Sequence, residues 1–336
     1  MTRGRWIQAS VLLVIGLLIL YGLFRTVHPA EVGAAIRGAS PGWVLLGFLS
    51  FLGFVALRGW RWHLILGASG SRATIGDTIA ITGVGFGVNS VSPFKLGELL
   101  RIAMMAQRAG IGIGEAGATV VLERILDVLA LLVLAIAAAV LSGNRSNAGG
   151  VWGGLAVLSA ISLCVGIAAY LMILNRAGTI ALIEGISGWL PPRVRSPLVG
   201  LADSVLRGFT FLRSPDRFAI VGALSLFTWI APTLGLVAYF RAVRPDLPLA
   251  TLYLAVTLFT ITQAISVTPA SVGTYEGLFV LVLNAFHAGP PSALTAVAVI
   301  AHIGTIVALL LTGALGAAWL RLNGPLPVRT ERAVSS

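Results

Sequence analysis

Two short segments of similar sequence interrupt the apolar regions of this chain, and their residue types are suited to binding an anion. Ser90–Pro93 (SVSP), followed by Gly97, recurs as Ser266–Pro269 (SVTP), followed by Gly273 at the same spacing. A glutamate follows each copy, at Glu98 and Glu276. A helix that begins at a proline has unpaired N–H groups and a partial positive charge at that end. Two such helix starts that converge inside a membrane would favour an anion such as a lipid phosphate.

The first copy lies in Gly83–Arg101, a polar stretch between segments that are apolar enough for a membrane. Lipid tails cannot solvate polar groups, so this stretch must face protein or a water-filled cavity. Lys95, Glu98 and Arg101 follow at intervals of three residues and could contact a headgroup or relay a proton. Chance similarity or close helix packing is the alternative explanation of the repeat. The candidate residues of the two copies are Asn89, Ser92, Pro93, Lys95, Glu98, Arg101, Thr268, Pro269, Gly273 and Glu276.

Three further charged residues lie near the start of the apolar segment 116–141. Glu123, Arg124 and Asp127 are three and four residues apart, so they share one face of a helix. Two interpretations fit this spacing. The residues form a buried ion pair, or they complete a cavity around Glu98.

The composition is that of an integral membrane protein. Of the 336 residues, 57% are hydrophobic and 10% are charged, whereas about 25% of the residues in a soluble domain are charged. The net charge of +11 comes from arginines that flank apolar segments, which is typical of cytoplasmic membrane loops and argues against a nucleic-acid partner. The single cysteine, Cys164, excludes an intrachain disulfide.

The sequence contains no recognisable catalytic or metal-binding motif. No histidine has a carboxylate or a second histidine at the spacing of a metal site. A nucleophile elbow, an H-E-x-x-H motif and a P-loop are also missing from the sequence. We therefore expect no metal site, no cofactor and no enzymatic activity. His63, His287 and His302 are isolated and are expected to be interface or packing residues.

The apolar segments predict an all-α, polytopic membrane helical bundle of about eight spans plus a re-entrant helix pair, with a weak internal repeat. Residues 1–320 form a single transmembrane domain, and residues 321–336 form a short basic cytoplasmic tail. The re-entrant pair is expected between Thr74 and Arg108, because glycines interrupt its first run and both of its ends look cytoplasmic. The second copy lies either in a span or in another re-entrant loop. The predicted spans are 6–24, 41–57, 116–141, 151–174, 218–240, 250–267, 271–286 and 292–320.

Arginine and tryptophan positions predict how the chain lies in the membrane. Arg58, Trp60, Arg61 and Trp62 end the second span and are expected to form an interface anchor, with guanidinium groups on lipid phosphates. The segment 176–217 has apolar residues at helical spacing, which predicts an amphipathic segment on the cytoplasmic membrane surface or a docking site for a partner. Basic residues place both termini in the cytoplasm.

Four motifs resemble the flippase-like membrane domain of the lysyl-phosphatidylglycerol synthases, over nearly the whole chain. They are R-x-x-R-W at Arg58–Trp62, Asn89 with P-x-x-x-G-E-x-x-R at Pro93–Arg101, E-R-x-x-D at Glu123–Asp127, and T-P-x-x-x-G-x-x-E at Thr268–Glu276. One departure is Ala270, where the family commonly has glycine. The full-length synthases attach lysine in a soluble domain that has no counterpart in this chain, so aminoacyl transfer is not expected.

The resemblance implies lipid translocation in a bacterial inner membrane. We expect a flippase or transporter for a phospholipid, an aminoacyl-lipid, or a polyprenyl or hopanoid-type lipid. Membrane lipids are the expected partners, and a lipid-modifying enzyme is a further candidate partner. Two other functions stay open, namely a non-catalytic accessory subunit of a lipid-modifying enzyme and a membrane-embedded lipid transferase or phosphatase.

Overall fold

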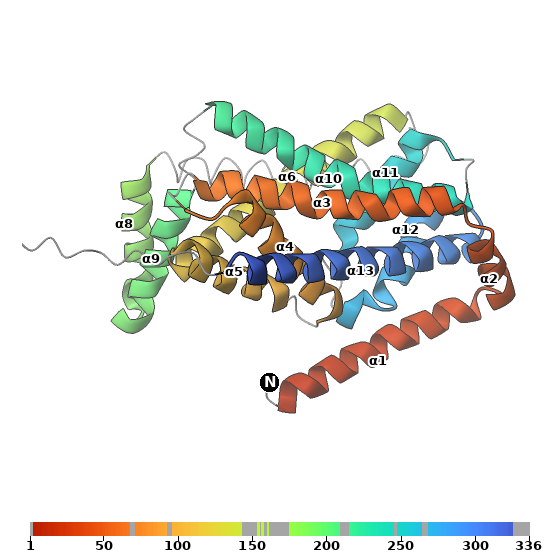
Figure 1. The fold of residues 1–336 in the computed structure, drawn as a ribbon, viewed down its shortest axis with the longest axis horizontal. Coiled ribbons are helices and arrows are strands. Elements are labelled where there is room, and N and C mark those ends of the chain that lie inside the picture. Colours follow the sequence, from red (N-terminus) through yellow and green to blue (C-terminus); the bar gives the residue numbers. More distant parts are fainter. Residues whose placement is uncertain are drawn as a thin grey trace, which may run out of the picture.

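The computed structural model describes residues 3–67, 71–92, 96–142, 175–208, 215–244, 247–263 and 268–324, with isolated positions between 153 and 160. Within these ranges the chain forms helices and short 3-10 turns, without a β-strand (Figure 1). The predicted all-α membrane bundle is confirmed. The expected span at 151–174 lies outside the described residues apart from those isolated positions, as does the tail from residue 325 onward.

Four described helices are long and apolar enough to cross a membrane. They are α3 (Pro41–Gly67), α6 (Ile113–Ser142), α10 (Pro215–Val243) and α13 (Pro291–Leu322). The helix α1 (Arg3–Arg25) meets α2 (Pro29–Arg37) at a bend of 91°, and this pair adds a fifth candidate span. The described chain therefore has fewer spans than the eight predicted.

Apart from the segment 151–174, which lies outside the described residues, the two missing spans are in the second half of the chain. The predicted spans 250–267 and 271–286 are the shorter helices α11 (Leu249–Thr262) and α12 (Thr274–Ala285), with 14 and 12 residues. At 1.5 Å per residue they extend about 21 and about 18 Å, whereas a hydrocarbon core is about 30 Å thick. Hydropathy alone could not distinguish these two half-length helices from full spans.

The helices α4 (Ile75–Val91) and α5 (Leu96–Ala109) form an antiparallel hairpin. A Cβ placed on Gly97 would lie 1.9 Å from the carbonyl oxygen of Gly85, so the two backbones are in direct contact. The predicted helix pair is thus present as a hairpin, and its re-entrant position in a membrane stays a prediction. Contrary to the prediction, glycines do not interrupt its first helix, because α4 runs without a break through all three of them. These glycines instead allow neighbouring segments to approach closely.

The hairpin packs along α13 in the opposite chain direction. A Cβ on Gly316 would lie 2.3 Å from the carbonyl oxygen of Ala80, and one on Gly87 would lie 3.1 Å from that of Leu309. Residue numbers therefore fall along α13 as they rise along α4. The C-terminal end of α4 consequently points toward the middle of α13.

A second hairpin approaches the same region from the other end of the bundle (Figure 1). The helix α12 joins α13 through residues 286–290 and packs back against it, so the start of α12 also points toward the middle of α13. The 3-10 turn η5 (Pro269–Ser271) precedes α12 and contacts α4. The tips of two hairpins that enter from opposite ends therefore meet inside the bundle.

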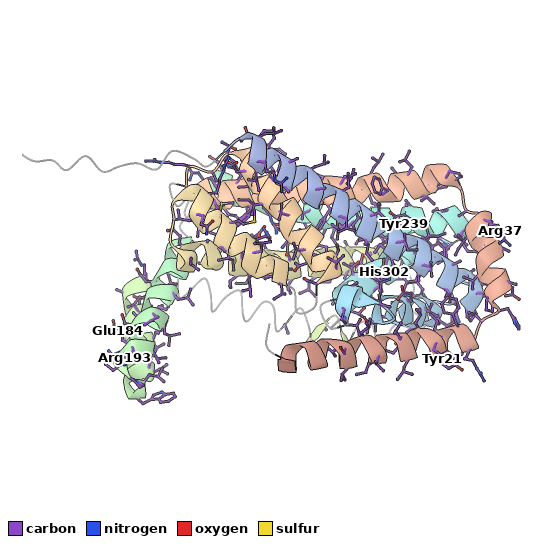
Figure 2. All side chains as sticks on the ribbon, turned by 60° about the horizontal axis from the view of Figure 1, so that its bottom comes forward. Tyr21, Arg37, Glu184, Arg193, Tyr239 and His302 are labelled. Atoms are coloured by element: carbon purple, nitrogen blue, oxygen red, sulfur yellow. The ribbon has the colours of Figure 1, made fainter. Side chains whose placement is uncertain are left out.

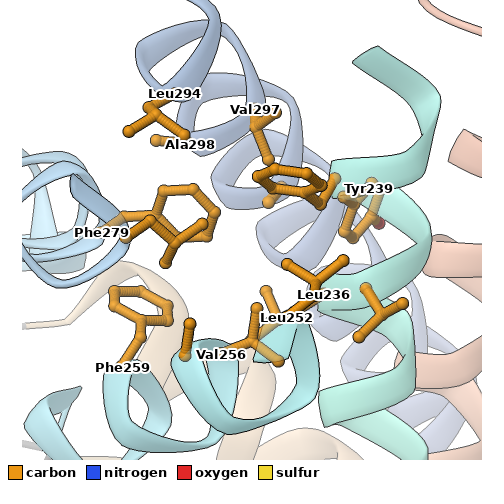
Figure 3. Packing of buried hydrophobic residues seen from close by; sticks show 14 of the residues in the cluster. Leu236, Tyr239, Leu252, Val256, Phe259, Phe279, Leu294, Val297 and Ala298 are labelled. Carbon is orange, nitrogen blue, oxygen red and sulfur yellow. The ribbon is translucent and has the colours of Figure 1, made fainter. Parts of the chain in front are cut away.

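A large apolar cluster between α10, α11, α12 and α13 holds the second hairpin in place. Phe259 and Phe279 are packed edge to face, with ring centroids 4.9 Å apart, and Tyr239 and Leu294 contribute to the same cluster (Figure 3). Each of these side chains is almost fully buried. The position of the second hairpin is therefore fixed by aromatic packing.

The segment predicted to be amphipathic forms two helices across one end of the bundle, on the left of Figure 1. They are α8 (Arg176–Ile186) and α9 (Pro192–Gly208), joined through the short turn η2 (Ser187–Trp189). Arg176 Nε donates to Asp203 Oδ1 at 2.9 Å and ties the two helices together. Ile186 and Trp189 are exposed. Their placement on a membrane surface stays a prediction.

Candidate functional site

Five fully or almost fully buried charged residues meet where α3, α5 and α6 pack together. Arg58 and Arg61 lie on α3, Arg101 on α5, and Glu123 and Asp127 on α6. Asp127 accepts hydrogen bonds from Arg58 Nη2 and Arg61 Nη2, each at 2.7 Å. Arg101 Nη2 donates to Glu123 Oε2 at 2.8 Å. Taking charges out of water is costly, so a network of this kind must be closely paired to persist.

Residues from neighbouring helices surround this buried cluster. The indole N–H of Trp229, on α10, donates to Asp127 Oδ1 at 2.9 Å. The guanidinium of Arg101 lies 4.3 Å from the ring centroid of Trp62, and that of Arg58 lies 5.2 Å from the ring of Phe86. Such cation–π contacts stabilise a cation that has lost its water shell. Glycine at position 85 makes room for this arrangement, because a Cβ there would lie 2.2 Å from Arg101 Cγ.

One side of the cluster is open to the surroundings of the protein. Glu98 bridges Arg101, at 3.3 Å between Oε2 and Nη1, and Arg124, with which it forms a close ion pair. The side chain of Arg124 is 45% exposed and that of Glu98 is 15% exposed, whereas Arg101 has no exposed surface. The pair Arg124–Glu98 is therefore the accessible rim of an otherwise closed site.

The cluster contains more hydrogen-bond donors than its acceptors satisfy. Four arginines face three carboxylates, which gives a formal net charge of +1. Arg58 Nε and Nη1, Arg61 Nε and Arg101 Nε are buried without a hydrogen-bond partner among the described residues. A buried N–H without a partner is costly. Glu123 Oε1 is likewise buried without a hydrogen-bond partner among the described residues, so the cluster has unsatisfied donors and one unsatisfied acceptor.

The predicted interface anchor at Arg58–Trp62 is wrong for three of its four residues. Arg58, Arg61 and Trp62 have no exposed surface, and only Trp60, at 44%, faces outward. The reason is helical spacing, because residues 58, 61 and 62 lie on the side of α3 that packs inside the protein, and Trp60 lies on another side. The guanidinium groups therefore bind carboxylates of α6 instead of lipid phosphates.

The tip of the first hairpin is closed by a side-chain cap. Asn89 Oδ1 accepts a hydrogen bond from the backbone N–H of Gly97, at 2.7 Å. Ser92 caps the end of α4 through its extended backbone, and its hydroxyl has no hydrogen-bond partner in the described part of the chain. Pro93 and Lys95, two of the predicted site residues, lie outside the described residues.

The base of the first hairpin is closed by an ion pair outside the four long helices. Asp77 Oδ1 lies 2.8 Å from Arg108 Nη2, and the Asp77 carboxylate also accepts the backbone N–H of Thr74 at 3.0 Å. Burial alone would raise the pKa of Asp77, but hydrogen bonds from Arg108 and Thr74 outweigh it and hold that pKa below its ordinary value. Asp77 thus stays ionised and fixes α4 to α5.

The tip of the second hairpin has an unusual backbone. Pro269 opens the turn η5, where Ala270 and Ser271 have left-handed φ angles of 51° and 56°. Gly273 follows with φ of 77°, and a Cβ there would lie 1.8 Å from the carbonyl oxygen of Gly16 in α1. The Thr268 hydroxyl donates to the carbonyl oxygen of Val272 at 3.0 Å and closes the turn. Only glycine fits at position 273, because both the φ angle and the contact with α1 exclude a side chain.

Glu276 and His302 form a buried pair behind this tip, which the sequence analysis did not predict. His302 Nδ1 lies 2.7 Å from Glu276 Oε1, and His302 Nε2 lies 2.9 Å from the carbonyl oxygen of Ala270. The ring of Tyr275 is stacked on the imidazole at 4.3 Å. Figure 2 shows His302 inside the bundle. The expectation that this histidine is isolated is therefore wrong. Its position inside a long apolar helix indicates that it needs a polar partner.

At each of the two half-helix starts, one backbone N–H that was expected to be free for an anion is already paired. The backbone N–H of Gly273 donates to Glu276 Oε2 at 2.8 Å, and that of Gly97 donates to Asn89. The partial positive charge at the start of α12 is thus already balanced by a carboxylate. Among the predicted site residues, the arginines of the buried cluster are better placed for an anion than the helix starts.

The predicted site residues of the described ranges therefore lie in the buried cluster and at the two hairpin tips, which are joined by the contact between α4 and η5. Asn89 and Ser92 lie at the first tip. Glu98, Arg101, Glu123, Arg124 and Asp127 are in the buried cluster, together with Arg58 and Arg61. Thr268, Pro269, Gly273 and Glu276 form the second tip, together with His302. The described residues contain no group of three or more histidine, cysteine, aspartate or glutamate side chains that could hold a metal ion. The interactions in the buried cluster and at the second tip are ion pairs and hydrogen bonds.

Comparison with known proteins connects this arrangement to a family of membrane regions. The chain is 26% identical to glycosyltransferase AglD of Haloferax volcanii over an alignment of 360 residues. The alignment covers 99% of this chain and 57% of AglD. It thus spans little more than half the length of that relative. It is also 24% identical to a UPF0104 membrane protein of Methanothermobacter thermautotrophicus over 334 residues, which cover 93% of this chain and 94% of that protein.

A family model also matches most of this chain. The model described as lysylphosphatidylglycerol synthase TM region matches residues 7–313, which include both hairpins and the buried cluster. The resemblance drawn from the four motifs is thereby confirmed. The chain belongs to the family of lysylphosphatidylglycerol synthase transmembrane regions.

Proposed function

We propose that this protein moves an anionic amphipathic lipid between the two leaflets of a membrane. The observation that carries the proposal is the meeting of two hairpin tips, entering from opposite ends, beside buried charges that have unused hydrogen-bond donors. Pairs of broken helices that meet near mid-depth are typical of the substrate sites of secondary transporters. The family membership supports a membrane-embedded role.

The rim of the buried cluster is the proposed entry point for the lipid headgroup. Arg124 is the most accessible arginine of the cluster, and its partner Glu98 also binds Arg101. A phosphate that takes the place of Glu98 would receive hydrogen bonds from both arginines, in the bidentate geometry that guanidinium groups favour. The formal charge of +1 on the cluster matches a single anionic headgroup. The acyl chains would stay in the surrounding lipid.

The pair Glu276–His302 is proposed to hold the second tip in the shape that the lipid headgroup meets. His302 Nδ1 lies 2.7 Å from Glu276 Oε1, and His302 Nε2 lies 2.9 Å from the carbonyl oxygen of Ala270. Glu276 Oε2 also accepts the backbone N–H of Gly273 at 2.8 Å. The pair therefore joins α13 to both sides of the turn, and breaking it would loosen the second tip.

The proposed orientation has both termini on the cytoplasmic side of a bacterial inner membrane. The start of α1 and the end of α13 lie at the same end of the bundle, together with α8 and α9 (Figure 1). Arg72, Arg176, Arg193, Arg195 and Arg321 belong to the segments at this end. An excess of arginine is typical of cytoplasmic loops. The amphipathic helices would then lie on the inner membrane surface.

A second candidate function is supported by the relative named a glycosyltransferase. Because 43% of AglD has no counterpart in the matched region, a transmembrane region of this family also occurs within a longer protein. On this hypothesis the chain would be a non-catalytic membrane subunit that helps a lipid-modifying enzyme. The exposed apolar residues Ile186 and Trp189 would then contribute to the docking surface.

A leaflet-exchange assay distinguishes the two functions. The purified protein is reconstituted into liposomes that contain fluorescent phosphatidylglycerol or phosphatidylcholine, and the dye accessible to an external quencher is followed over time. We expect the wild type to exchange phosphatidylglycerol, and we expect Arg124→Gln and Glu276→Gln to slow the exchange. Arg176→Gln is the matched control, because it removes an arginine that is similarly exposed, at 43%, but pairs with Asp203 and not with a carboxylate of the cluster.

Two outcomes would contradict the proposal. Wild-type rates in both Arg124→Gln and Glu276→Gln would rule out the proposed site, whatever the protein transports. The absence of exchange with either lipid, together with co-purification of a lipid-modifying enzyme, would favour the accessory function.

A further inference from the structure

An apolar groove of about 330 Å³ lies between α3, α4 and α13, away from the buried cluster. Leu52 and Ala56 of α3, Ile79 of α4, and Thr312, Leu315 and Trp319 of α13 line it. The polar side-chain groups in the lining are the Thr312 hydroxyl, which donates to the carbonyl oxygen of Leu309 in its own helix at 2.8 Å, and the indole N–H of Trp319. The rest of the lining is apolar, so the groove offers water little to bind.

The groove exists because glycines bring its walls together at one end. A Cβ on Gly76 would lie 2.4 Å from Cζ2 of Trp319, so the indole lies directly on the backbone of α4. Gly316 makes the corresponding close contact with Ala80. Trp319 is nevertheless 43% exposed. The indole thus forms one wall of the groove and also faces the surroundings of the protein.

The groove is separate from the proposed route of the headgroup. Ala56 and Arg58 are two residues apart on α3, so they lie on different sides of that helix. Ala56 is exposed in the groove, whereas Arg58 is fully buried against α6. A ligand in the groove would therefore not contact the arginines of the cluster.

The surroundings of the groove decide which ligand it fits. Apolar cavities of this kind exclude water and accept hydrocarbon. The two helices α3 and α13 that flank the groove are both candidate membrane spans, so the medium around them is lipid. At the end marked by Trp319, the exposed residues Arg72 and Arg321 add positive charge. Tryptophan with arginine is the typical composition of a membrane interface.

We propose that this groove binds one acyl chain of an anionic phospholipid, with the headgroup toward Arg72 and Arg321. From Thr312 to Trp319 the groove follows α13 for about 10 Å, at 1.5 Å per residue, so it holds part of an acyl chain, and its apolar lining suits hydrocarbon. The arginines supply the charge that selects an anionic headgroup over a zwitterionic one. This binding site does not depend on lipid translocation, so the two proposals succeed or fail separately.

Native mass spectrometry of the purified protein tests this proposal. After delipidation, the protein is titrated with phosphatidylglycerol or with phosphatidylcholine of the same chain length. We expect the wild type to retain one phosphatidylglycerol under conditions that remove the others. Ala56→Phe should lose that lipid, because the new ring fills the groove from an exposed position without replacing a buried side chain.

Two further variants make the test specific. Ala314→Phe is the matched control, since Ala314 is also exposed but lies on the side of α13 that does not line the groove, and it should retain the lipid. Arg72→Gln combined with Arg321→Gln should retain a lipid but lose the preference for phosphatidylglycerol. Equal retention by Ala56→Phe and Ala314→Phe would overturn the acyl-chain site. An unchanged preference in the double arginine variant would overturn the assignment of the headgroup.

Discussion

Arg101 and Glu123 form an ion pair with 2.8 Å between Nη2 and Oε2, although neither side chain has any exposed surface. The pair joins the first hairpin to α6, and Glu123 also faces Arg61 at 3.5 Å. Because both charges have lost their water, each depends on the other for stability. This ion pair adds a charged contact with α6 to the apolar packing that already holds the hairpin in the bundle.

Replacing only one partner of this pair should destabilise the protein strongly. We expect Arg101→Met or Glu123→Met to cost about 3 to 5 kcal/mol, because each leaves an unpaired buried charge. The double variant should recover part of that loss, because it removes both charges. The thermal unfolding midpoint in detergent, followed by tryptophan fluorescence, measures the effect.

The exposed rim supplies the control for this prediction. Arg124→Gln removes an arginine whose side chain is 45% exposed, so it should cost less than about 1 kcal/mol. If Arg124→Gln were as destabilising as Arg101→Met, burial would not be the cause of the stability of the cluster.

The sequence was sufficient to predict the membrane class and most members of this cluster, but not how they pair. Glu123, Arg124 and Asp127 were placed on one helix face by their spacing. The structure pairs Glu123 and Asp127 with buried arginines of α5 and α3, whereas Arg124 pairs with Glu98 at the accessible rim, so each of the two interpretations describes part of the arrangement. The partners Arg58 and Arg61 were assigned to the lipid interface. Arginine beside tryptophan is typical of both environments, and only the packing of α3 against α6 distinguishes them.

The cap at the first hairpin tip should contribute measurably to stability. Asn89→Ala removes the acceptor of the Gly97 N–H, and loss of a helix cap costs about 0.5 to 2 kcal/mol. Asn89→Asp keeps an acceptor at the start of α5 and should be closer to wild type. Thermal unfolding of the three proteins gives the comparison. Equal stability of Asn89→Ala and wild type would show that the hydrogen bond contributes nothing net.

The close contact between α4 and α5 should require glycine at position 97. A Cβ on Gly97 would lie 1.9 Å from the carbonyl oxygen of Gly85, so Gly97→Ala should cost at least about 1 to 3 kcal/mol through overpacking. Gly53, in α3, is the matched control, because an added Cβ would meet nothing within 4 Å. Gly53→Ala should stabilise the protein by about 0.5 to 1 kcal/mol. Similar effects of the two substitutions would contradict the close packing of α4 and α5.

The second tip contains one residue, His302, whose partner could not be predicted from the sequence. The repeat identified Thr268, Pro269, Gly273 and Glu276, and the structure places them in one turn. His302 was missed because it is 26 residues from Glu276, and only the packing of α12 against α13 brings them together. Its signal was physical, since an ionisable side chain inside an apolar span needs a partner.

Ala270 is a site at which this chain should accept a stabilising substitution. Its φ of 51° is left-handed, which costs an L-residue about 1 to 2 kcal/mol, whereas glycine adopts it readily. Glycine also loses more conformational entropy on folding than alanine, which offsets part of the strain that is relieved. The net effect of Ala270→Gly should be a stabilisation of about 0.5 to 1 kcal/mol. Ala314→Gly, in the regular part of α13, should destabilise by about the same amount. A loss of stability in Ala270→Gly would contradict the backbone conformation described for η5.

The pair Glu276–His302 should hold the second tip in place, and lipid exchange should depend on it. The imidazole of His302 lies 2.7 Å from Glu276 Oε1 and 2.9 Å from the carbonyl oxygen of Ala270, so it joins α13 to α12 and η5. Removing the ring leaves buried hydrogen-bonding groups without a partner, so His302→Ala should cost about 1 to 3 kcal/mol and should slow exchange in the liposome assay. Tyr275→Phe, which keeps the aromatic ring that is stacked on the imidazole, should exchange lipid at the wild-type rate. Thermal unfolding in detergent and the liposome assay give the two measurements. Wild-type stability and wild-type exchange in His302→Ala would contradict the role of this pair.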